Sequence, residues 1–393
     1  MHSTVLEAPH PPQSSKKSKS KAAPTTEALL AKAQELVVQC EYELGRQFVD
    51  RVLERDSENV EARELKGVVE MEAGNPERAK GIFLSLVPPS PSAPSPAPPS
   101  VHLYLAQLLA DDDPRAALGQ YRTAVDLLVT RLGGKGKGKT EKSLEGLEEE
   151  EEEIRRMVVR VCCSMVDIWM TDLCFEPEAE SSCEEILRHA LDTDPENTEA
   201  LLSLASVRMS QQRPDEAEQC VHKVWSTWEG IAADSPSHPA PPTLLSFARL
   251  CLELNLFALA LASLSRTLEM DDQEVEAWYL EGWAFWLMYQ DEGSAVNLTQ
   301  SAQDGEQGEK MTKEDMLRDA RDCLDTCAML HQAQEHPDEQ ILLHVKELLG
   351  ELEALGVHAA LPEEEGEGEQ LTGDGDDGEW VDEDDEDKDV DMS

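Results

Sequence analysis

The sequence predicts an all-α fold, a superhelix of about seven helix pairs with a C-terminal capping helix and disordered ends. Low-complexity segments at both ends suggest the disorder, and a repeat of small and apolar residues suggests the pairs. The repeat has a spacing of 34 residues, and it aligns Ala33, Gly45, Val49 and Val52 with Gly67, Ala79, Phe83 and Leu86; Thr171, Cys183, Leu187 and Ala190 with Ala205, Ala217, Val221 and Val224; and Ala248 with Gly282.

A spacing of 34 residues, with small side chains where two helices touch, is typical of tetratricopeptide (TPR) repeats. Each repeat is a helix pair, and neighbouring pairs stack to bury a continuous core. Such a solenoid presents an extended surface to another chain, so the pattern favours binding over covalent chemistry.

The first helix pairs are expected directly after a Lys-, Ser- and Pro-rich segment at 1–24, which we expect to be disordered. The first pair runs from about Thr25 to Asp56, and the turn DSEN at 56–59 separates it from the second. A proline-rich insertion at 88–100 ends the second pair, in which Phe83 is expected to fill the space between repeats.

Two further insertions interrupt the predicted solenoid, which extends over 25–360. Glycine and opposite charge blocks at 133–153 indicate a mobile loop, so the fourth pair is expected to begin at Ile154. A polar insertion at 290–313 separates the helices of the seventh pair. Residues 338–355 carry apolar side chains on one helical face and are expected to cap the open end.

The chain is strongly acidic, with a formal net charge of −48. We expect the segment at 361–393 to be a disordered acidic tail, but about two thirds of the net charge lies before it. This charge argues against direct contact with nucleic acid or an anionic membrane and favours a basic protein partner. The alternative is that the acidity serves solubility alone.

No pattern in the sequence indicates catalysis, a cofactor or a metal. The motifs HExxH, GxSxG and CxxC are absent, and the ten histidines do not cluster. The nine cysteines are scattered through predicted helices, which indicates buried thiols in a reducing compartment. We therefore expect a protein that is not an enzyme.

The predicted binding surface is the concave groove, which the first helix of each TPR pair lines. Its inward positions are the second, fifth, ninth and twelfth of each repeat, and here they combine carboxylates with aromatic and methionine side chains that suit a basic peptide. The candidate client-binding residues are Glu61, Glu64, Met71, Asp172, Phe175, Glu199, Met209, Glu276, Tyr279, Trp283 and Trp286. For the aromatic residues of the seventh repeat the alternative is packing against the terminal helix.

Both ends of the chain carry one further candidate feature. Trp380 stands alone among acids in GEWVDEDDED, where a single aromatic side chain can anchor a short binding motif. Four lysines between Lys16 and Lys21 form a short basic cluster that could recruit nuclear import machinery.

The whole arrangement resembles the dedicated assembly chaperones of large-subunit ribosomal protein number four. The resemblance is carried by AKAQELVVQCEYELGRQFVDRVLERDSENVEARELKGVVEMEAGNPERAKGIF, by the tail GEWVDEDDED, and by the order of lysine-bearing start, TPR units and acidic end. It implies a non-enzymatic escort that binds a newly made basic ribosomal protein and keeps it soluble until delivery to pre-ribosomes, in the cytoplasm and the nucleus. Two alternatives remain, a TPR scaffold subunit of a multiprotein complex and a histone chaperone.

Overall fold

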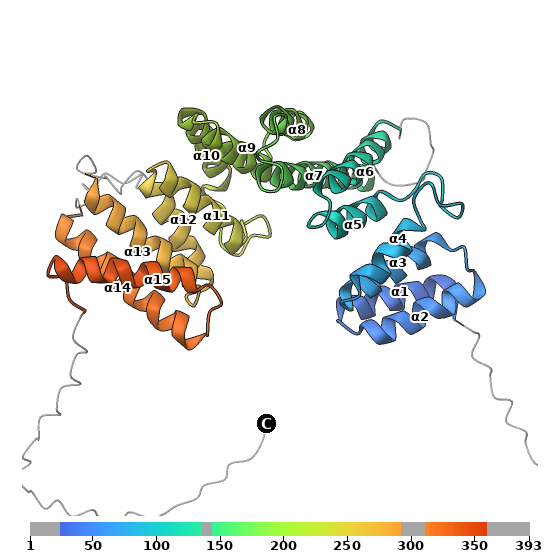
Figure 1. Cartoon of the computed structure of the whole chain (residues 1–393), viewed down its shortest axis with the longest axis horizontal. Helices are drawn as coiled ribbons and strands as arrows, with labels where there is room; N and C mark the ends of the chain where they lie inside the picture. The colour runs from blue at the N-terminus through green and yellow to red at the C-terminus, as the bar shows by residue number, and fades with distance from the viewer. Residues whose placement is uncertain (1–23, 135–143, 292–310, 360–393) are drawn as a thin grey trace, which may run out of the picture. The chain divides into compact units, whose positions relative to one another are not determined.

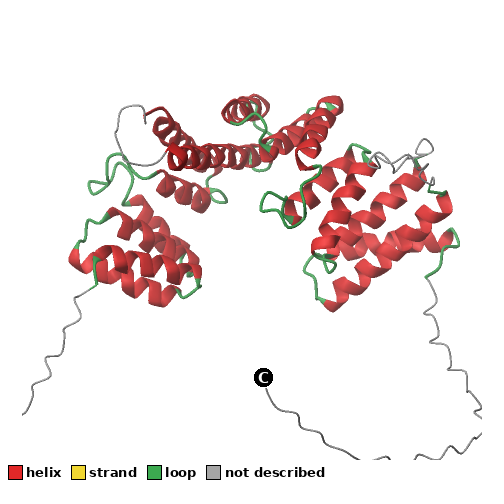
Figure 2. Ribbon diagram, turned by 180° about the vertical axis from the view of Figure 1, so that it is seen from behind, coloured by secondary structure: helices red, strands yellow, loops and turns green. Residues whose placement is uncertain are grey.

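We describe the chain from a computed structural model, which covers residues 24–134, 144–291 and 311–359. These residues form fifteen helices and no strand (Figures 1 and 2). The helices are α1 (Thr26–Val38), α2 (Tyr42–Arg55), α3 (Val60–Glu72), α4 (Pro76–Leu84), α5 (Pro99–Leu109), α6 (Pro114–Gly134), α7 (Leu144–Met170), α8 (Ala179–Thr193), α9 (Thr198–Ser210), α10 (Pro214–Trp228), α11 (Pro241–Glu253), α12 (Phe257–Met270), α13 (Val275–Gln290), α14 (Lys313–Ala333) and α15 (Glu339–Ala354).

The helices pair in sequence order, as the repeat predicts. Seven pairs run from α1/α2 to α13/α14, and α15 follows as an additional helix. The chain divides into two compact units, Met1–Met270 with α1–α12 and Asp271–Ser393 with α13–α15, and each is described by itself. The all-α TPR fold is confirmed, whereas a single domain over 25–360 stays a prediction. The expected disorder of 1–24 and 361–393 falls almost entirely outside the described residues.

Helix ends in the first unit follow local capping chemistry. The side chain of Thr25 accepts a hydrogen bond from the Ala28 amide at the start of α1. Asn59 and Asn197 cap α3 and α9 in the same way, accepting from Ala62 and Ala200. Each cap satisfies a backbone amide that has no partner inside its helix, so each fixes where a first helix begins.

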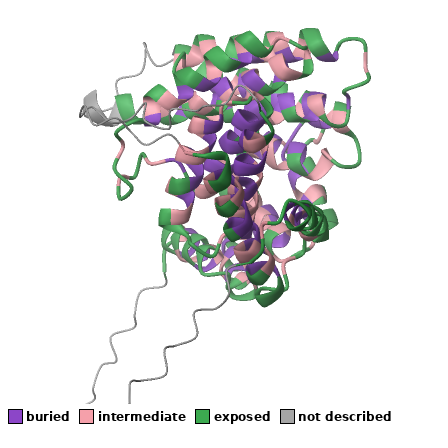
Figure 3. Cartoon of the chain, turned by 90° about the vertical axis from the view of Figure 1, so that its left-hand side faces the viewer, coloured by how far each residue is buried: buried purple, intermediate pink, exposed green. Residues whose placement is uncertain are grey.

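Close contact between paired helices depends on the small residues of the repeat. A Cβ atom added at Gly67 would lie 2.4 Å from Cε1 of Phe83, so the ring occupies the space that a side chain would need. Gly282 stands in the same relation to Leu324, at 2.8 Å from Cγ. Buried residues lie on the helix faces turned toward neighbouring helices (Figure 3).

The expected loop at 133–153 is wrong for its described second half, because α7 begins at Leu144. Glutamate is a good helix former, and the acidic run is followed by arginines at helical spacing. Arg155 pairs with Glu151 and Glu152 at 3.5 and 3.6 Å, and Arg156 pairs with Glu152 at 3.4 Å. The fourth pair therefore starts earlier than Ile154. Residues 135–143 lie outside the described part.

The second unit is one helix pair with α15 packed on both helices. The apolar face of α15 buries Ile341, Val345, Leu348 and Leu352. This contact confirms the predicted capping helix. Across the part of the chain that the structure describes, no helix is both long and apolar enough to span a membrane.

Candidate functional site

The first helices of unit 1 carry three carboxylates with raised pKa values. Glu64 on α3 is half-buried and accepts a hydrogen bond from the Ser100 hydroxyl on α5. Burial raises the pKa of Glu64, and the charge of Glu61 adds to the shift, while Ser100 opposes it. The predicted residues Glu61 and Glu64 thus lie near each other on α3, and Glu64 also contacts α5. The charged form of the Glu64 carboxyl is less favourable here than in water.

A second acidic position lies between α7 and α9. The surrounding protein desolvates Asp167 and Glu199 enough to raise the pKa of each carboxyl, although both side chains remain exposed. For Glu199 the charge of Asp167 raises the pKa further, and that of Arg160 lowers it. Glu199 was predicted, whereas Asp167 and Arg160 were not. Their spacing of seven residues on one helix is a signal that could have revealed them.

A groove of about 500 Å³ separates α9 from α11. Met209, predicted as an anchor, lines it with Ser206 on one wall, and Ser246, Arg249 and Glu253 line the other. Met71 has a different environment, because it is half-buried and packs against the apolar cluster around Phe83. Of the two predicted methionines, Met209 is therefore the one that lines an open groove.

Asp172 and Phe175 do not lie on a first helix, so their predicted helical placement is wrong. The 34-residue frame put them there, but α7 ends at Met170. Both residues belong to the turn before α8, and Phe175 is 98% exposed. Because α7 ends at Met170, the charged residues of this helix that lie near Glu199 are Arg160 and Asp167.

The predicted aromatic residues of the second unit pack within it. Tyr279 and Trp283 stack with ring centroids 5.9 Å apart, and both rings contact His344 of α15 edge-on. The Tyr279 hydroxyl also hydrogen-bonds Nδ1 of His344 at 2.8 Å. Trp286 is only 6% exposed, which leaves it inaccessible to a partner. Glu276 is half-buried at the start of α13, and Trp380 lies outside the described residues.

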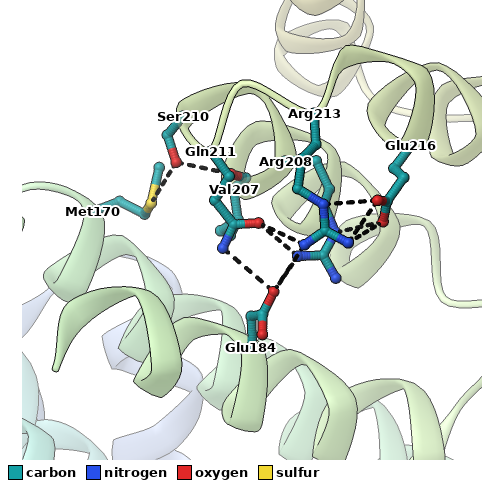
Figure 4. A network of polar contacts seen from close by, with 8 residues as sticks. All are labelled: Met170, Glu184, Val207, Arg208, Ser210, Gln211, Arg213 and Glu216. Atoms are coloured by element: carbon teal, nitrogen blue, oxygen red, sulfur yellow. Dashed lines mark hydrogen bonds and ion pairs between the residues drawn. The ribbon is translucent and has the colours of Figure 1, made fainter.

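An ion-pair network fixes α9 between α8 and α10 (Figure 4). Arg208 on α9 contacts Glu184 of α8 and, at 3.2 Å, Glu216 of α10. Arg213 bridges the same two carboxylates at 3.1 and 2.6 Å. The network fixes the position of α9, the helix that carries Glu199 and Met209.

The acidic side chains of the site can pair with the cationic side chains of another protein. Within the described ranges no group of three or more His, Cys, Asp or Glu side chains could hold a metal ion. The surface of Glu61, Glu64, Asp167 and Glu199, together with the α9/α11 groove, is called the first-helix surface below. Its carboxylates offer charge-assisted pairing to lysine or arginine.

Comparison with known proteins identifies the repeats. Models described as tetratricopeptide repeat match residues 30–94 and 181–226. A protein named "Probable assembly chaperone of rpl4" from Schizosaccharomyces pombe is 31% identical over 301 residues, which is 76% of this chain and 82% of the relative. The chain belongs to this family.

Two further relatives support the assignment. A protein of the same name from Emericella nidulans is 32% identical over 50% of this chain and 52% of its own length. A solved structure, "Assembly Chaperone of RpL4 (Acl4) (Residues 1-338)", superposes with a TM-score of 0.60 and 25% identity, covering 68% of this chain and 98% of that one. Membership in the rpl4 assembly-chaperone family confirms the resemblance seen in the sequence.

Proposed function

We propose that this chain is a non-enzymatic, dedicated chaperone that binds newly made large-subunit ribosomal protein number four and escorts it toward ribosome assembly. Family membership names the class of client, and the acidic first-helix surface supplies the chemistry to hold a basic one. The chaperone acts by covering charge and apolar surface, so it needs no turnover.

The observation that carries the proposal is family membership, joined to three acidic side chains on the first helices α3, α7 and α9. These are Glu64, Asp167 and Glu199, and desolvation raises the pKa of each carboxyl. In the isolated chain these charged groups lack full solvation. A lysine or arginine of the client supplies the missing counter-charge, so binding relieves an unfavourable state already present. Both the new ion pair and the relief of the desolvated charge make the free energy of binding more favourable.

The test compares two triple variants with equal charge change. The groove variant carries Glu64→Gln, Asp167→Asn and Glu199→Gln. The control variant carries Glu54→Gln, Asp126→Asn and Glu269→Gln, which change exposed carboxylates on the second helices α2, α6 and α12. The groove variant is expected to lose the ability to keep the purified ribosomal protein soluble as it is diluted from denaturant, while the control variant keeps it.

Three outcomes decide between the alternatives. Equal protection by wild type and both variants contradicts the surface assignment. Binding to histones in preference to the ribosomal protein makes the chain a histone chaperone. Co-purification from cells with a stable set of non-ribosomal subunits, without the ribosomal protein, makes it a scaffold.

Cytoplasmic and nuclear residence forms part of the same proposal. Delivery to pre-ribosomes in the nucleus requires entry, and the lysines between Lys16 and Lys21 are the candidate signal for import machinery. Replacing all four lysines by serine is expected to confine a fluorescent fusion to the cytoplasm. An unchanged distribution removes this role from the cluster.

A further inference from the structure

The turn between α7 and α8, residues 171–178, presents an aromatic ring entirely to solvent. Phe175 is 98% exposed, the most exposed of the large apolar side chains in the described residues. A phenylalanine gains free energy when it leaves water, and exposed aromatic rings commonly become buried anchors at protein interfaces. A partner that covers this ring therefore gains affinity from it.

The turn holds Phe175 in a defined position. Leu173 is buried below it, and its amide donates to the Ile168 carbonyl at 3.0 Å. The Glu176 amide in turn donates to the Leu173 carbonyl at 3.0 Å. From α6, Arg115 pairs with Glu176 at 3.0 Å and with Glu178 at 3.6 Å. Ordering the turn thus costs little on binding, because these contacts already fix it.

The charge around Phe175 selects a basic partner. Asp172 is exposed three residues before the ring, and Glu176 and Glu178 follow it. The same two glutamates already hold the guanidinium of Arg115, which shows that the turn accommodates this group. Its acidity opposes nucleic acid and anionic lipid.

We propose that the α7–α8 turn is a second docking point for the basic client, in which an arginine side chain lies over the Phe175 ring and pairs with Asp172. The inference rests on the proposed function, because the client is the same protein. Arginine fits better than lysine, since its planar guanidinium can stack on a ring and also form hydrogen bonds to a carboxylate. The turn lies outside the first-helix surface and extends the contact beyond the groove.

The test measures the affinity of the full chain for the purified ribosomal protein by titration calorimetry. Phe175→Ala is expected to weaken binding about 3- to 10-fold, the range of a cation–π contact that becomes partly desolvated. Phe175→Leu should weaken it about as much, because leucine is apolar but has no ring face. Phe175→Tyr keeps the ring and should bind within about twofold of wild type.

Each outcome bears on one claim. Full affinity of Phe175→Ala, with weakened binding of the groove variant, overturns the second docking point and leaves the proposed function standing. Full affinity of Phe175→Leu overturns the arginine contact. If both Phe175→Ala and the groove variant bind as wild type does, the first-helix surface assignment fails as well. Only a wild-type chain that does not bind the ribosomal protein contradicts the proposed function. Since the Phe175 side chain is exposed, unchanged melting temperatures serve as the folding control.

Discussion

Two repeat junctions in unit 1, α2–α3–α4 and α8–α9–α10, have similar turns and begin their helices in the same way. The turn DSEN before α3 corresponds to DPEN before α9, and an asparagine ends each turn and caps the next helix. The second helices α4 and α10 both begin with proline, Pro76 and Pro214. The two junctions are therefore a natural pair of matched sites within one chain.

The junctions differ in the sign of a charge triad at corresponding positions. In the first, a glutamate on α3 lies between two arginines; in the second, an arginine on α9 lies between two glutamates. The triads are Arg46–Glu70–Arg78 and Glu184–Arg208–Glu216. Both junctions therefore hold a neutralised charge at this position, and the fold accepts either sign.

The central residues also differ in burial and in support. Glu70 is 4% exposed, with contacts of 2.9 Å to Arg46 and 4.0 Å to Arg78. Its Oε2 atom and Nη2 of Arg46 are buried without a hydrogen-bond partner. Arg208 is more exposed and shares its carboxylates with Arg213. Loss of the first central charge should thus cost more than loss of the second.

The largest expected effect is that of Glu70→Ala, which removes the buried partner of the Arg46 guanidinium and leaves it only the exposed Glu43, at 2.9 Å. We expect the free energy of unfolding to fall by about 3 kcal/mol. Urea unfolding followed by circular dichroism measures it. The full inversion Arg46→Glu, Glu70→Arg and Arg78→Glu copies the second triad and should restore most of the loss. An inversion as unstable as the single variant contradicts the equivalence of the two junctions.

The next effect tests the helix contact inside each repeat. Gly67 packs against Phe83 in the first junction. The corresponding residues of the α8–α9–α10 junction are Ala205 and Val221, and both are buried. Gly67→Ala is expected to lower the free energy of unfolding by about 2 kcal/mol, because the added Cβ overlaps the Phe83 ring. Adding Phe83→Val to Gly67→Ala reproduces the second combination and should recover part of the loss. A double variant whose loss equals the sum of the single losses shows that the two positions are independent.

A smaller effect is expected for Arg208→Ala. Its partners Glu184 and Glu216 are partly exposed and keep Arg213, so the loss should be about 1 kcal/mol. The same urea experiment measures it beside Glu70→Ala. A loss equal to that of Glu70→Ala would mean that burial does not separate the junctions.

The smallest effect concerns pH. The raised pKa values of Glu64, Asp167 and Glu199 mean that the folded chain binds protons more tightly there than the unfolded chain. Their contribution to stability therefore grows as pH falls from 7 through the raised pKa values and is complete below their ordinary values. The groove variant should be more stable than wild type at pH 7, by about 0.5 kcal/mol after solvent screening. Thermal unfolding at several pH values should show this advantage shrinking toward pH 4.5; a constant advantage contradicts the assignment.

The sequence predicted the features that depend on local packing. The seven pairs follow from small residues at a fixed spacing, and the turn at 56–59 between α2 and α3 follows from its polar residues. The start of α7 was missed because an acidic run beside glycine-rich sequence resembles a linker, although glutamate favours helix. Asp172 and Phe175 were misplaced for a separate reason: the alignment of Thr171 with Ala205 extends the first helix beyond residue 170, whereas α7 ends at Met170.

The tertiary partners could not be predicted from position alone. Packing of the seventh-repeat aromatic residues against the terminal helix was the alternative given for them, and the structure bears it out. Their spacing does not indicate that His344 of α15 makes the contact. The repeat pattern also did not reveal the charge triads. Their positions correspond in the two junctions, but the charges at those positions have opposite signs. Such pairings depend on the register between helices, which becomes visible only in the folded chain.

The most direct test of the central claim is the affinity of the purified chain for ribosomal protein number four at low and moderate salt, measured in parallel for wild type, groove variant and control variant. A client held by the first-helix surface predicts that wild type and control bind tightly and weaken as salt rises. The groove variant should bind more weakly at both salt concentrations and depend less on salt. Equal affinity and equal salt dependence of all three proteins would contradict the account.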